Sequence, residues 1–488
     1  MSDTRFAPQK RRNLPSILRC YALFEIKLHI IVSQIKYIVV SLSYSKYKVI
    51  RARYARKRQK MNKYAIVNAN VISGKENDAV LKDAIIIVED GHISDITTDK
   101  DSALGLKQID LGGKYILPGL INMHVHLPGS GMPKDTKKQN KETVHKLMSH
   151  KLTKYIVYRL CASYAKVELM SGVTTIRTVG GLDDIDSIIR DKSNAGKIKA
   201  PRILASNMAV SVKDGHMAGL LAYEAKDAQD GAKIVDKIAK TNPDLIKLMI
   251  TGGILDAKVE GEPGVLRMSP EIVKACCDKA HEYGFKVAAH VESPLGVTVA
   301  LENGVDTIEH GGTVTEHEIE LFKKNGGAHI LTISPTVPLT LFPLEKSGGT
   351  KLHKINSEVV FKGMIQCART CLDNGIPVGL GTDTACPYVT HYDMWRELMY
   401  FKKYLGVSNE FAIHTATLVN AQIAGIDDVT GSLEIGKSAD FMVVNGNPLE
   451  DLETLRNPQM VVLRGNVIKH PKVKKFAYVE EELDKYIR

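Results

Sequence analysis

Short apolar runs alternate with helix-like stretches between Pro118 and about Asp427, and this alternation restricts the fold more than any other feature of the chain. The intervening stretches, such as residues 222–241 and 269–285, repeat apolar residues with the period of a helix. Continuously apolar strands are typical of parallel strands that are buried on both faces. Eight strand–helix units over roughly 300 residues therefore predict an α/β fold, a (β/α)8 TIM barrel over residues 118–427. The eight runs are LINMHVHL, VTTIRTV, PRILAS, LIKLMI, KVAAHV, DTIEH, AHILTIS and IPVGLGTD.

The segments on either side of the barrel region have strand-like patterns instead. Residues 61–117 contain three short strand candidates separated by turn signals such as Asp90-Gly91 and Gly112-Gly113. Residues 428–480 return to the same pattern after the last barrel unit. Because neither segment is long enough to bury a core by itself, we expect the two to form one composite β-sandwich beside the barrel.

Positive charge is concentrated in the N-terminal extension, residues 1–60. The whole chain carries a formal charge of +11, but this extension holds 15 Lys/Arg against only 2 Asp/Glu, and the remainder is close to neutral. The charge of the globular body therefore does not indicate nucleic-acid binding, and the sequence after the extension has no nucleic-acid recognition motif. Lys27 and Lys36 interrupt the apolar residues, so no stretch reaches the roughly 18 residues that a membrane span needs.

We interpret the extension as a segment that is not part of the mature protein, for instance because a start codon has been placed too early. A new strand-like pattern begins abruptly at Met61, and no small-residue cleavage pattern follows the apolar residues. A basic membrane-surface helix or an organelle transit peptide is the alternative interpretation.

The cysteines indicate a reducing, cytoplasmic environment. The chain has seven, an odd number, and no Cys-x-x-Cys pair. This usage favours free thiols over a disulfide framework. Cys367 and Cys371 are spaced by one helical turn, and for this pair we favour packing against the core over metal binding.

Polar residues that can bind metal occur where several of the apolar runs end, which is the side of a parallel barrel that carries the chemistry. His124 and His126 are two residues apart in the first run, so both side chains point to the same face of a strand. The others are Lys247 in the fourth run, His290 in the fifth, His310 in the sixth and Asp383 in the eighth.

Each of these residues has an ordinary structural explanation when taken alone. A lone histidine is usually a hydrogen-bonded core residue, a lone lysine extends along the apolar surface, and an aspartate after Gly-Thr often forms a turn. These separate explanations would have to hold for all six residues at once. A metal site accounts for them together, because imidazole and carboxylate are ligands that suit zinc and related divalent ions. A lysine desolvated near cations loses its proton more easily, and its neutral amine reacts with carbon dioxide to give a carbamate that can bridge two metals.

The sequence around these residues resembles the amidohydrolase superfamily, in its two-metal branch. It is most similar to the imidazolonepropionase-related group that contains Xaa-Pro and Xaa-Arg dipeptidases and ochratoxinase-like amidases. The resemblance covers residues 61 to about 470. The matching segments are LPGLINMHVHL, GVTTIR, IKLMITGG, SPEIVKACCDKAHEYGFKVAAHVES, GVDTIEHGG, GTDTA and GSLEIGKSADFMVV.

The resemblance implies a ligand set and a mechanism. His124, His126 and Asp383 would bind one metal ion, His290 and His310 a second, and carboxylated Lys247 would bridge them. Two divalent ions, zinc being the expected metal, would share a hydroxide that attacks an amide carbonyl. Asp383 would move the proton to the leaving amine.

His216 is the second candidate catalytic residue, because the resemblance implies that a histidine after the third strand stabilises the oxyanion. The sequence departs from its relatives here. They usually have a Gly-Gly-His-Gly run, whereas this chain has Lys213-Asp214-Gly215-His216-Met217. A plain loop histidine is therefore the alternative at this position.

The predicted function is cleavage of the amide bond of a dipeptide or N-acyl amino acid, by a homo-oligomer as the resemblance implies. The first alternative is a mononuclear deaminase or imidazolone-ring hydrolase of the same superfamily. Such enzymes generally lack the lysine, and many carry a glutamate where this chain has Ser293, with Glu292 one position earlier. A non-catalytic scaffold is the remote alternative, since scaffolds of this superfamily have lost ligands that are all present here.

Overall fold

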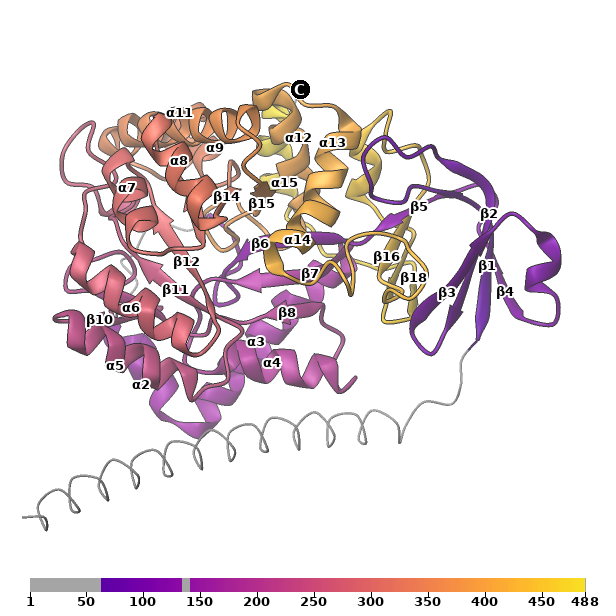
Figure 1. Ribbon diagram of the computed structural model, residues 1–488, viewed down its shortest axis with the longest axis horizontal. Helices are drawn as coiled ribbons and strands as arrows, with labels where there is room; N and C mark the ends of the chain where they lie inside the picture. Colours follow the sequence, from indigo (N-terminus) through magenta and orange to yellow (C-terminus); the bar gives the residue numbers. More distant parts are fainter. Residues whose placement is uncertain (1–62, 134–140, 488) are drawn as a thin grey trace, which may run out of the picture. The chain divides into compact units, whose positions relative to one another are not determined.

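The computed structural model describes residues 63–133 and 141–487, and both ends of this range contribute to one sheet (Figure 1). Its strands are β1 (Tyr64–Val71), β2 (Leu81–Glu89), β3 (His92–Thr97), β4 (Lys107–Asp110), β5 (Tyr115–Pro118), β16 (Phe441–Val444), β17 (Met460–Leu463) and β18 (Asn466–Lys469). The strand order is β18-β17-β16-β5-β1-β2-β3, and β4 pairs with β1. Strands β5 and β16 are antiparallel, with Ile116 opposite Val443, so this one pair joins the two halves of the sheet.

The two segments of this sheet also share a core. Ile66, Ile86 and Ile116 from the N-terminal strands pack with Phe441 and Val462 from the C-terminal strands, and all five are fully buried. Hydrogen bonding defines a single sheet of eight strands, so the division into the two layers of a sandwich stays a prediction.

Strands occur at all eight positions predicted for the barrel. They are β6 (Leu120–Val125), β7 (Val173–Thr178), β8 (Arg202–Leu204), β11 (Leu245–Met249), β12 (Lys286–Val291), β13 (Thr307–His310), β14 (Ala328–Leu331) and β15 (Val378–Leu380). All their pairings are parallel, within one sheet of order β6-β7-β8 and another that runs from β11 to β15.

Two short strands were not predicted. Strands β9 (Ala209–Val212) and β10 (Ala222–Ala225) extend the second sheet beside β11. The helix predicted over residues 222–241 therefore begins later, as α5 (Ala228–Ala239). The reason is local, since the Asp227 side chain accepts the Asp230 N–H at 2.9 Å and caps the helix there.

Main-chain hydrogen bonds cross both places where the two parallel sheets meet. Asp244 N–H donates to the Ala205 carbonyl at 2.7 Å on one side, and Asp383 N–H donates to the His124 carbonyl at 2.8 Å on the other. Buried Asn420 reinforces the second junction. Its side chain donates to the carbonyls of Ile121 at 2.7 Å and Leu380 at 2.9 Å, and accepts from the Leu380 N–H at 2.9 Å.

The helices lie outside the parallel strands, and some of them begin at recognisable capping residues (Figure 1). Ser293 accepts the Gly296 N–H and is followed by proline at the first helical position of α7, and Thr315 with Glu318 forms a capping box at α8. The remaining α-helices are α2 (Lys141–Ser149), α3 (Lys151–Met170), α4 (Ile185–Asn194), α6 (Pro270–Glu282), α7 (Pro294–Glu302), α8 (Glu316–Asn325), α9 (Thr336–Leu341), α10 (Leu344–Ser347), α11 (Lys351–Asp373), α12 (Met394–Leu405), α13 (Asn409–His414), α14 (Asn420–Ala424) and α15 (Ala477–Leu483).

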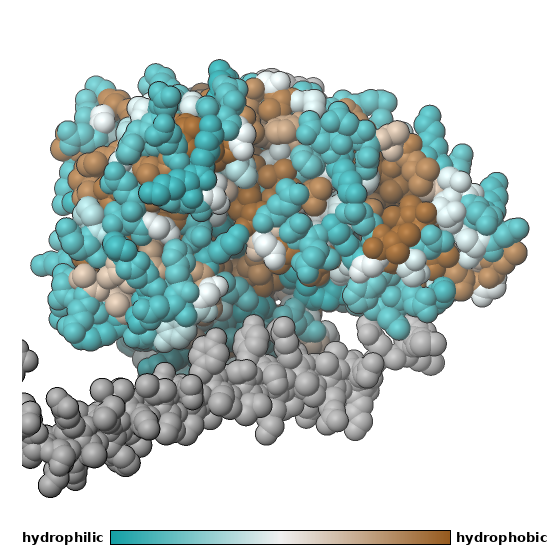
Figure 2. Space-filling view, in the orientation of Figure 1, coloured by the Kyte–Doolittle hydropathy of each residue, from teal (hydrophilic) through white to brown (hydrophobic). Residues whose placement is uncertain are grey.

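The surface of the described residues carries mixed polarity. On the face drawn in Figure 2, hydrophilic side chains are interspersed with smaller hydrophobic areas, as is ordinary for protein surfaces. Among the helices of the described ranges, none has both the length and the apolar character that crossing a membrane requires. The basic extension, residues 1–60, lies outside the described residues.

We expect Asn420→Ala to destabilise the protein by about 3 kcal/mol, because it leaves buried peptide groups of β6 and β15 without partners. Gln422→Ala is the matched control, since Gln422 is exposed on the same helix, α14; its effect should stay within about 0.5 kcal/mol. Urea unfolding followed by circular dichroism measures both. Equal stability of the two variants would contradict the bridging role of Asn420.

Candidate metal centre

Three of the predicted ligands lie together at the junction of β6 and β15. His124 and His126 come from the end of β6, and Asp383 follows β15. The Asp383 Oδ1 atom lies 3.5 Å from His124 Nε2 and 3.2 Å from His126 Nε2. The main-chain hydrogen bond from Asp383 to His124 sets this geometry, and Asp383 has a left-handed backbone with φ of 56°.

Two further predicted ligands lie beside this group. His290 on β12 and His310 at the end of β13 have ring centroids 4.7 Å apart, and the His310 ring lies 4.8 Å from that of His124. Glu292 brings a carboxylate into the same group, within 4.8 Å of the ligand atoms of both histidines. Its carboxylate also accepts the Ile254 N–H at 2.9 Å.

Lys247 on β11 is buried between these groups, with only 1% of its surface exposed. Its Nζ has no hydrogen-bond partner within the described residues. Burial lowers the pKa of its ammonium to about 8, against the opposing effect of Glu309. A buried amine without a partner is costly to keep, so the site as it stands is incomplete around Lys247.

The second ring nitrogen of each histidine in the first group is held by an acceptor. His124 Nδ1 donates to Glu309 Oε2 at 2.8 Å, and His126 Nδ1 donates to the Gly180 carbonyl at 2.9 Å. When both imidazoles are neutral, the lone pair of each Nε2 atom faces the lone pairs of Asp383 Oδ1. Acceptor atoms that face one another repel unless a cation lies between them, and metal-binding histidines are oriented in this way.

Local electrostatics keep the donor atoms in the protonation states that bind metal. Burial, with Lys247 nearby, lowers the pKa of His124, and burial lowers the pKa of His310 to about 3, so both imidazoles are neutral. Burial alone would raise the pKa of Asp383, but a proton on His124 or His126 favours the carboxylate and holds that pKa well below its ordinary value. Glu292 differs, because burial and the charge of Asp383 raise its pKa to about 8.

His216 lies at the edge of this centre, against His290. The two rings stack with centroids 4.1 Å apart and an angle of 4° between their planes. His216 Nδ1 is hydrogen-bonded to Asp256 Oδ2, which also accepts the Gly253 N–H at 3.3 Å. The pair fixes the ring and leaves Nε2 as the nitrogen able to meet a substrate.

Sequence reasoning missed four residues that complete the centre: Arg177, Asp256, Glu292 and Glu309. Arg177 and Glu309 are charged residues inside the apolar runs VTTIRTV and DTIEH, which is the same signal that identified Lys247. Arg177 Nη2 donates to both Glu309 oxygens, at 2.7 and 2.8 Å, and Glu309 is fully buried. Asp256 ends a short 3-10 helix (Ile254–Asp256) after β11, where the sequence pattern gives no comparable signal.

Comparison with known proteins decides the family. A model of the amidohydrolase family matches residues 115–468, most of the chain. The chain belongs to the amidohydrolase family. It is a hydrolytic enzyme that acts on carbon–nitrogen bonds, and the resemblance inferred from the sequence motifs is confirmed.

Several relatives of this amidohydrolase are known. A crystal structure of a candidate prolidase from Bifidobacterium longum is 36% identical, with a TM-score of 0.76 over 87% of this chain and 98% of that one. A Xaa-Pro dipeptidase with bound methionine is 28% identical, with a TM-score of 0.72 over 83% of this chain and 100% of that one. Ochratoxinase from Aspergillus niger is 24% identical over 413 residues, or 78% of this chain and 81% of the ochratoxinase.

We expect Glu309→Gln to destabilise the metal-free amidohydrolase by about 3–5 kcal/mol, because the charge of Arg177 is left buried without a counter-charge. Its affinity for zinc should fall by about 10–100-fold, since His124 loses its anionic partner. Urea unfolding and competitive zinc titration measure the two effects.

Glu302→Gln is the matched control for this substitution. Glu302 is exposed and pairs with His317 at 3.4 Å, an interaction worth about 1 kcal/mol or less. If Glu309→Gln were no less stable than Glu302→Gln, the buried ion pair would not support the centre.

Proposed function

We propose that this chain is a two-metal amidohydrolase that cleaves the amide bond of a dipeptide or an N-acyl amino acid. The observation that carries the proposal is the buried amine of Lys247, which has no hydrogen-bond partner among the described residues and lies close enough to the histidines of both groups to lower the pKa values of His124, His290 and His310. In the proposal, His124, His126 and Asp383 would hold one ion, His290 and His310 would hold the other, and carboxylated Lys247 would be a ligand of both. Zinc is the proposed metal, because the set contains only nitrogen and carboxylate donors.

Lys247 suits carboxylation for a chemical reason. A lysine amine reacts with carbon dioxide only in its neutral form, and burial makes that form accessible near neutral pH. The amine nitrogen forms a bond to the carbon of carbon dioxide and loses one proton, and the two oxygens of the resulting carbamate become the donor atoms of the side chain. Its negative charge would also balance part of the charge of two divalent ions in a buried site.

In the proposed hydrolysis, different residues of the chain carry out different steps. When bound, the two ions polarise the scissile carbonyl and lower the pKa of water. Asp383, ionised beside two histidines, accepts the proton of the attacking water and delivers it to the leaving amine nitrogen. His216, oriented by Asp256 and stacked on His290, can donate from Nε2 to the developing oxyanion when its ring carries a proton on both nitrogens.

We also propose that the eight parallel strands close into a (β/α)8 barrel over residues 118–427. The hydrogen bonds between Asp383 and His124 and between Asp244 and Ala205 support closure, since they cross the two gaps between the sheets. Residues 61–117 and 428–480 make the accompanying β domain. We further propose a cytoplasmic homo-oligomer, as the free thiols and the family suggest.

The relatives support this substrate class. Two of the similar structures are described as a candidate prolidase and a Xaa-Pro dipeptidase, and the second name is that of an enzyme acting on dipeptides. The alignment with this chain covers 98% of the first of these two structures. The substrate of this chain would be selected by the loops that follow the strands, which differ most between members of a fold.

A one-metal deaminase or cyclic-amide hydrolase is the second candidate, and Glu292 is the observation that favours it. A buried carboxyl beside His290 with a pKa of about 8 could transfer a proton to a ring nitrogen. That chemistry leaves the amine of Lys247 without a role, so we rank it second. A non-catalytic scaffold is ranked last, because the whole donor set is present.

We expect Lys247→Ala to lower the metal content from two ions per chain to one or fewer. Activity should fall by more than about 100-fold, the upper end of the effect of residues that only orient ligands. A short carboxylic acid such as acetate should restore part of the activity, because it can replace the bridging carboxylate in the space that opens. Metal analysis and an amidase assay measure this, with exposed Lys240→Ala as the control.

One ion per chain in the wild-type protein, with activity unchanged in Lys247→Ala, would refute the two-metal proposal.

We expect turnover in a panel of Xaa-Pro dipeptides, Xaa-Arg dipeptides and N-acyl amino acids supplied with zinc and bicarbonate. On the best substrate, His216→Asn should lower kcat by about 100-fold with little change in KM, because a donor to the oxyanion acts mainly in the transition state. Release of ammonia from a heterocycle, without turnover of any amide, would favour the one-metal alternative.

A further inference from the structure

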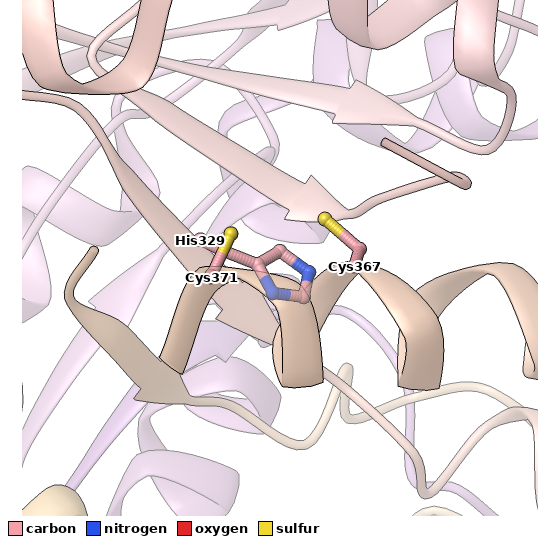
Figure 3. Close-up of side chains that lie close together, drawn as sticks. All are labelled: His329, Cys367 and Cys371. Carbon is pink, nitrogen blue, oxygen red and sulfur yellow. The ribbon is translucent and has the colours of Figure 1, made fainter. Parts of the chain in front are cut away.

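The buried thiols beside the parallel sheet have an ordinary place in the core. Cys367 and Cys371 of α11 lie close to His329 of β14 (Figure 3), and His329 Nε2 donates to the His310 carbonyl at 2.6 Å. Both cysteines belong to the main apolar cluster, in agreement with the core packing that their helical spacing indicated. The outer surface of helices α2 and α3 is different, because several of its large apolar side chains are exposed.

Five large apolar side chains are exposed on α2 and α3 within a short stretch of the sequence. Leu152 is 72% exposed and Ile156 is 58% exposed, and Leu147, Tyr155 and Leu160 are exposed as well. Single exposed apolar residues are ordinary on protein surfaces, but a contiguous group of them marks an interaction surface. We name Leu152, Ile156 and Leu160 the apolar row of α3.

The apolar row runs along the side of α3 that faces away from the core. Its members are four residues apart, so they follow one another along a single side of the helix. The opposite side of α3 carries Tyr158, Cys161 and Ala165, which are buried. Packing inside the protein therefore uses one side of α3 and leaves the apolar row to solvent.

Helix α2 also lacks a complete set of packing partners. None of its nine residues is buried, although it lies against α3. A helix of this length is marginal in water by itself and takes most of its stability from packing an apolar side. Val144 and Met148 pack partly on the main cluster, whereas Leu147 on the same side is exposed. The described residues thus cover the apolar side of α2 only in part.

Cations flank the apolar row. Lys151, Tyr155 and Arg159 form the neighbouring row of α3, again four residues apart, and the Arg159 guanidinium donates to the Tyr155 hydroxyl at 3.2 Å. Lys146 and Lys166 add two further exposed cations on the same pair of helices. Within the described ranges, none of these four cations has a carboxylate partner.

The acids nearby do not cancel this positive charge. Glu168 is buried and paired with a histidine, and Asp183 and Asp184 pair with a different cation, Lys154, at 3.1 and 3.0 Å. In these two described helices, Glu142 is the one exposed acid. A second copy of α3 packed on the apolar row would therefore bring cations against cations, so the charge favours an anionic partner.

We propose that the apolar row of α3 and its flanking cations dock the protein on an anionic lipid bilayer. A helix that combines Lys and Arg with an apolar side lies in the plane of the interface, with its apolar side chains among the acyl chains and its cations at the headgroups. Tyr155, with a polar tip on an apolar ring, suits the boundary between the two. A bilayer deforms around protruding side chains, whereas a protein partner would need a matching groove. This docking is peripheral and independent of the amide-hydrolysis proposal.

Vesicle sedimentation tests the proposal on the full-length protein. Vesicles of phosphatidylcholine with about one-third phosphatidylserine should bind it, and vesicles of phosphatidylcholine alone should bind it much more weakly. Leu152→Ser/Ile156→Ser should lower the partition coefficient by at least about tenfold, because two apolar side chains no longer enter the bilayer. Arg159→Gln/Lys166→Gln should lower it by about tenfold or more at low salt. Failure of the wild type to bind the anionic vesicles, or unchanged binding in both variants, would overturn the proposal.

Leu104→Ser/Ile435→Ser is the matched control for the apolar variant. These two side chains are 70% and 64% exposed and lie in the β domain. The control should bind vesicles as the wild type does, and both double variants should keep the unfolding free energy of the wild type because the replaced side chains are exposed. An equal loss of binding in the control would indicate unspecific adsorption of apolar residues and would overturn the proposal.

A tryptophan placed in the apolar row locates the contact. This is needed because residues 1–60 are strongly basic and can bind anionic vesicles by themselves. The chain has one tryptophan, buried Trp395, which gives a constant background. Brominated lipids should quench the added fluorescence of Ile156→Trp but not that of Leu104→Trp. An unquenched Ile156→Trp would overturn the proposal even if the protein sediments with the vesicles.

Light scattering without vesicles separates lipid docking from contact between copies of the chain. Leu152→Ser/Ile156→Ser should have the same molar mass as the wild type, because the apolar row faces lipid in the proposal. A smaller assembly in this variant would assign the row to an interface between copies and would overturn the proposal.

Discussion

The buried ion pair between Arg177 and Glu309 is the interaction around which the candidate centre is arranged. Arg177 donates to the Met123 carbonyl at 2.8 Å, to Thr307 at 3.0 Å and to both oxygens of Glu309, so it links β6, β7 and β13. Glu309 in turn accepts from His124. Two charges withdrawn from water are tolerated only when their hydrogen bonds are satisfied, and here every contact of the pair also orients a strand that carries a proposed ligand.

The environment of the centre also separates its carboxyl groups by function. A proton on His124 or His126 lowers the pKa of Asp383, whereas burial and the charge of Asp383 raise the pKa of Glu292 to about 8. Before metal binds, Glu292 therefore holds its proton at neutral pH, and a protonated carboxyl is a poor ligand. The distances alone would admit Glu292 to the second group of ligands, but its protonation state argues for the set His290, His310 and Lys247. Pairs of groups whose pKa values are driven apart in this way mark acid and base roles in enzymes.

Sequence patterns predicted those parts of the molecule that depend on local order. The eight parallel strands follow from apolar runs, and the meeting of His124 and Asp383 follows from the shared edge of parallel strands. Arg177 and Glu309 could not be predicted from local patterns, because each lies inside an apolar run and its partners are far away in the chain. Helix α5 begins later than predicted because the capping by Asp227 outweighs the helical pattern of residues 222–227.

The pairing of β5 with β16 has a consequence for the order in which the protein is made. Strand β5 leaves the ribosome long before β16 does, and until then its edge toward β16 has no partner. The side chain of Ile116 is also not fully buried until Phe441 and Val462 have been synthesised and pack against it. Unpaired edges and exposed apolar faces are the sites at which nascent chains aggregate or bind chaperones. The N-terminal strands are thus among the first to be synthesised and among the last to be completed, so a ribosome that stalls before residue 441 releases a chain with an open sheet.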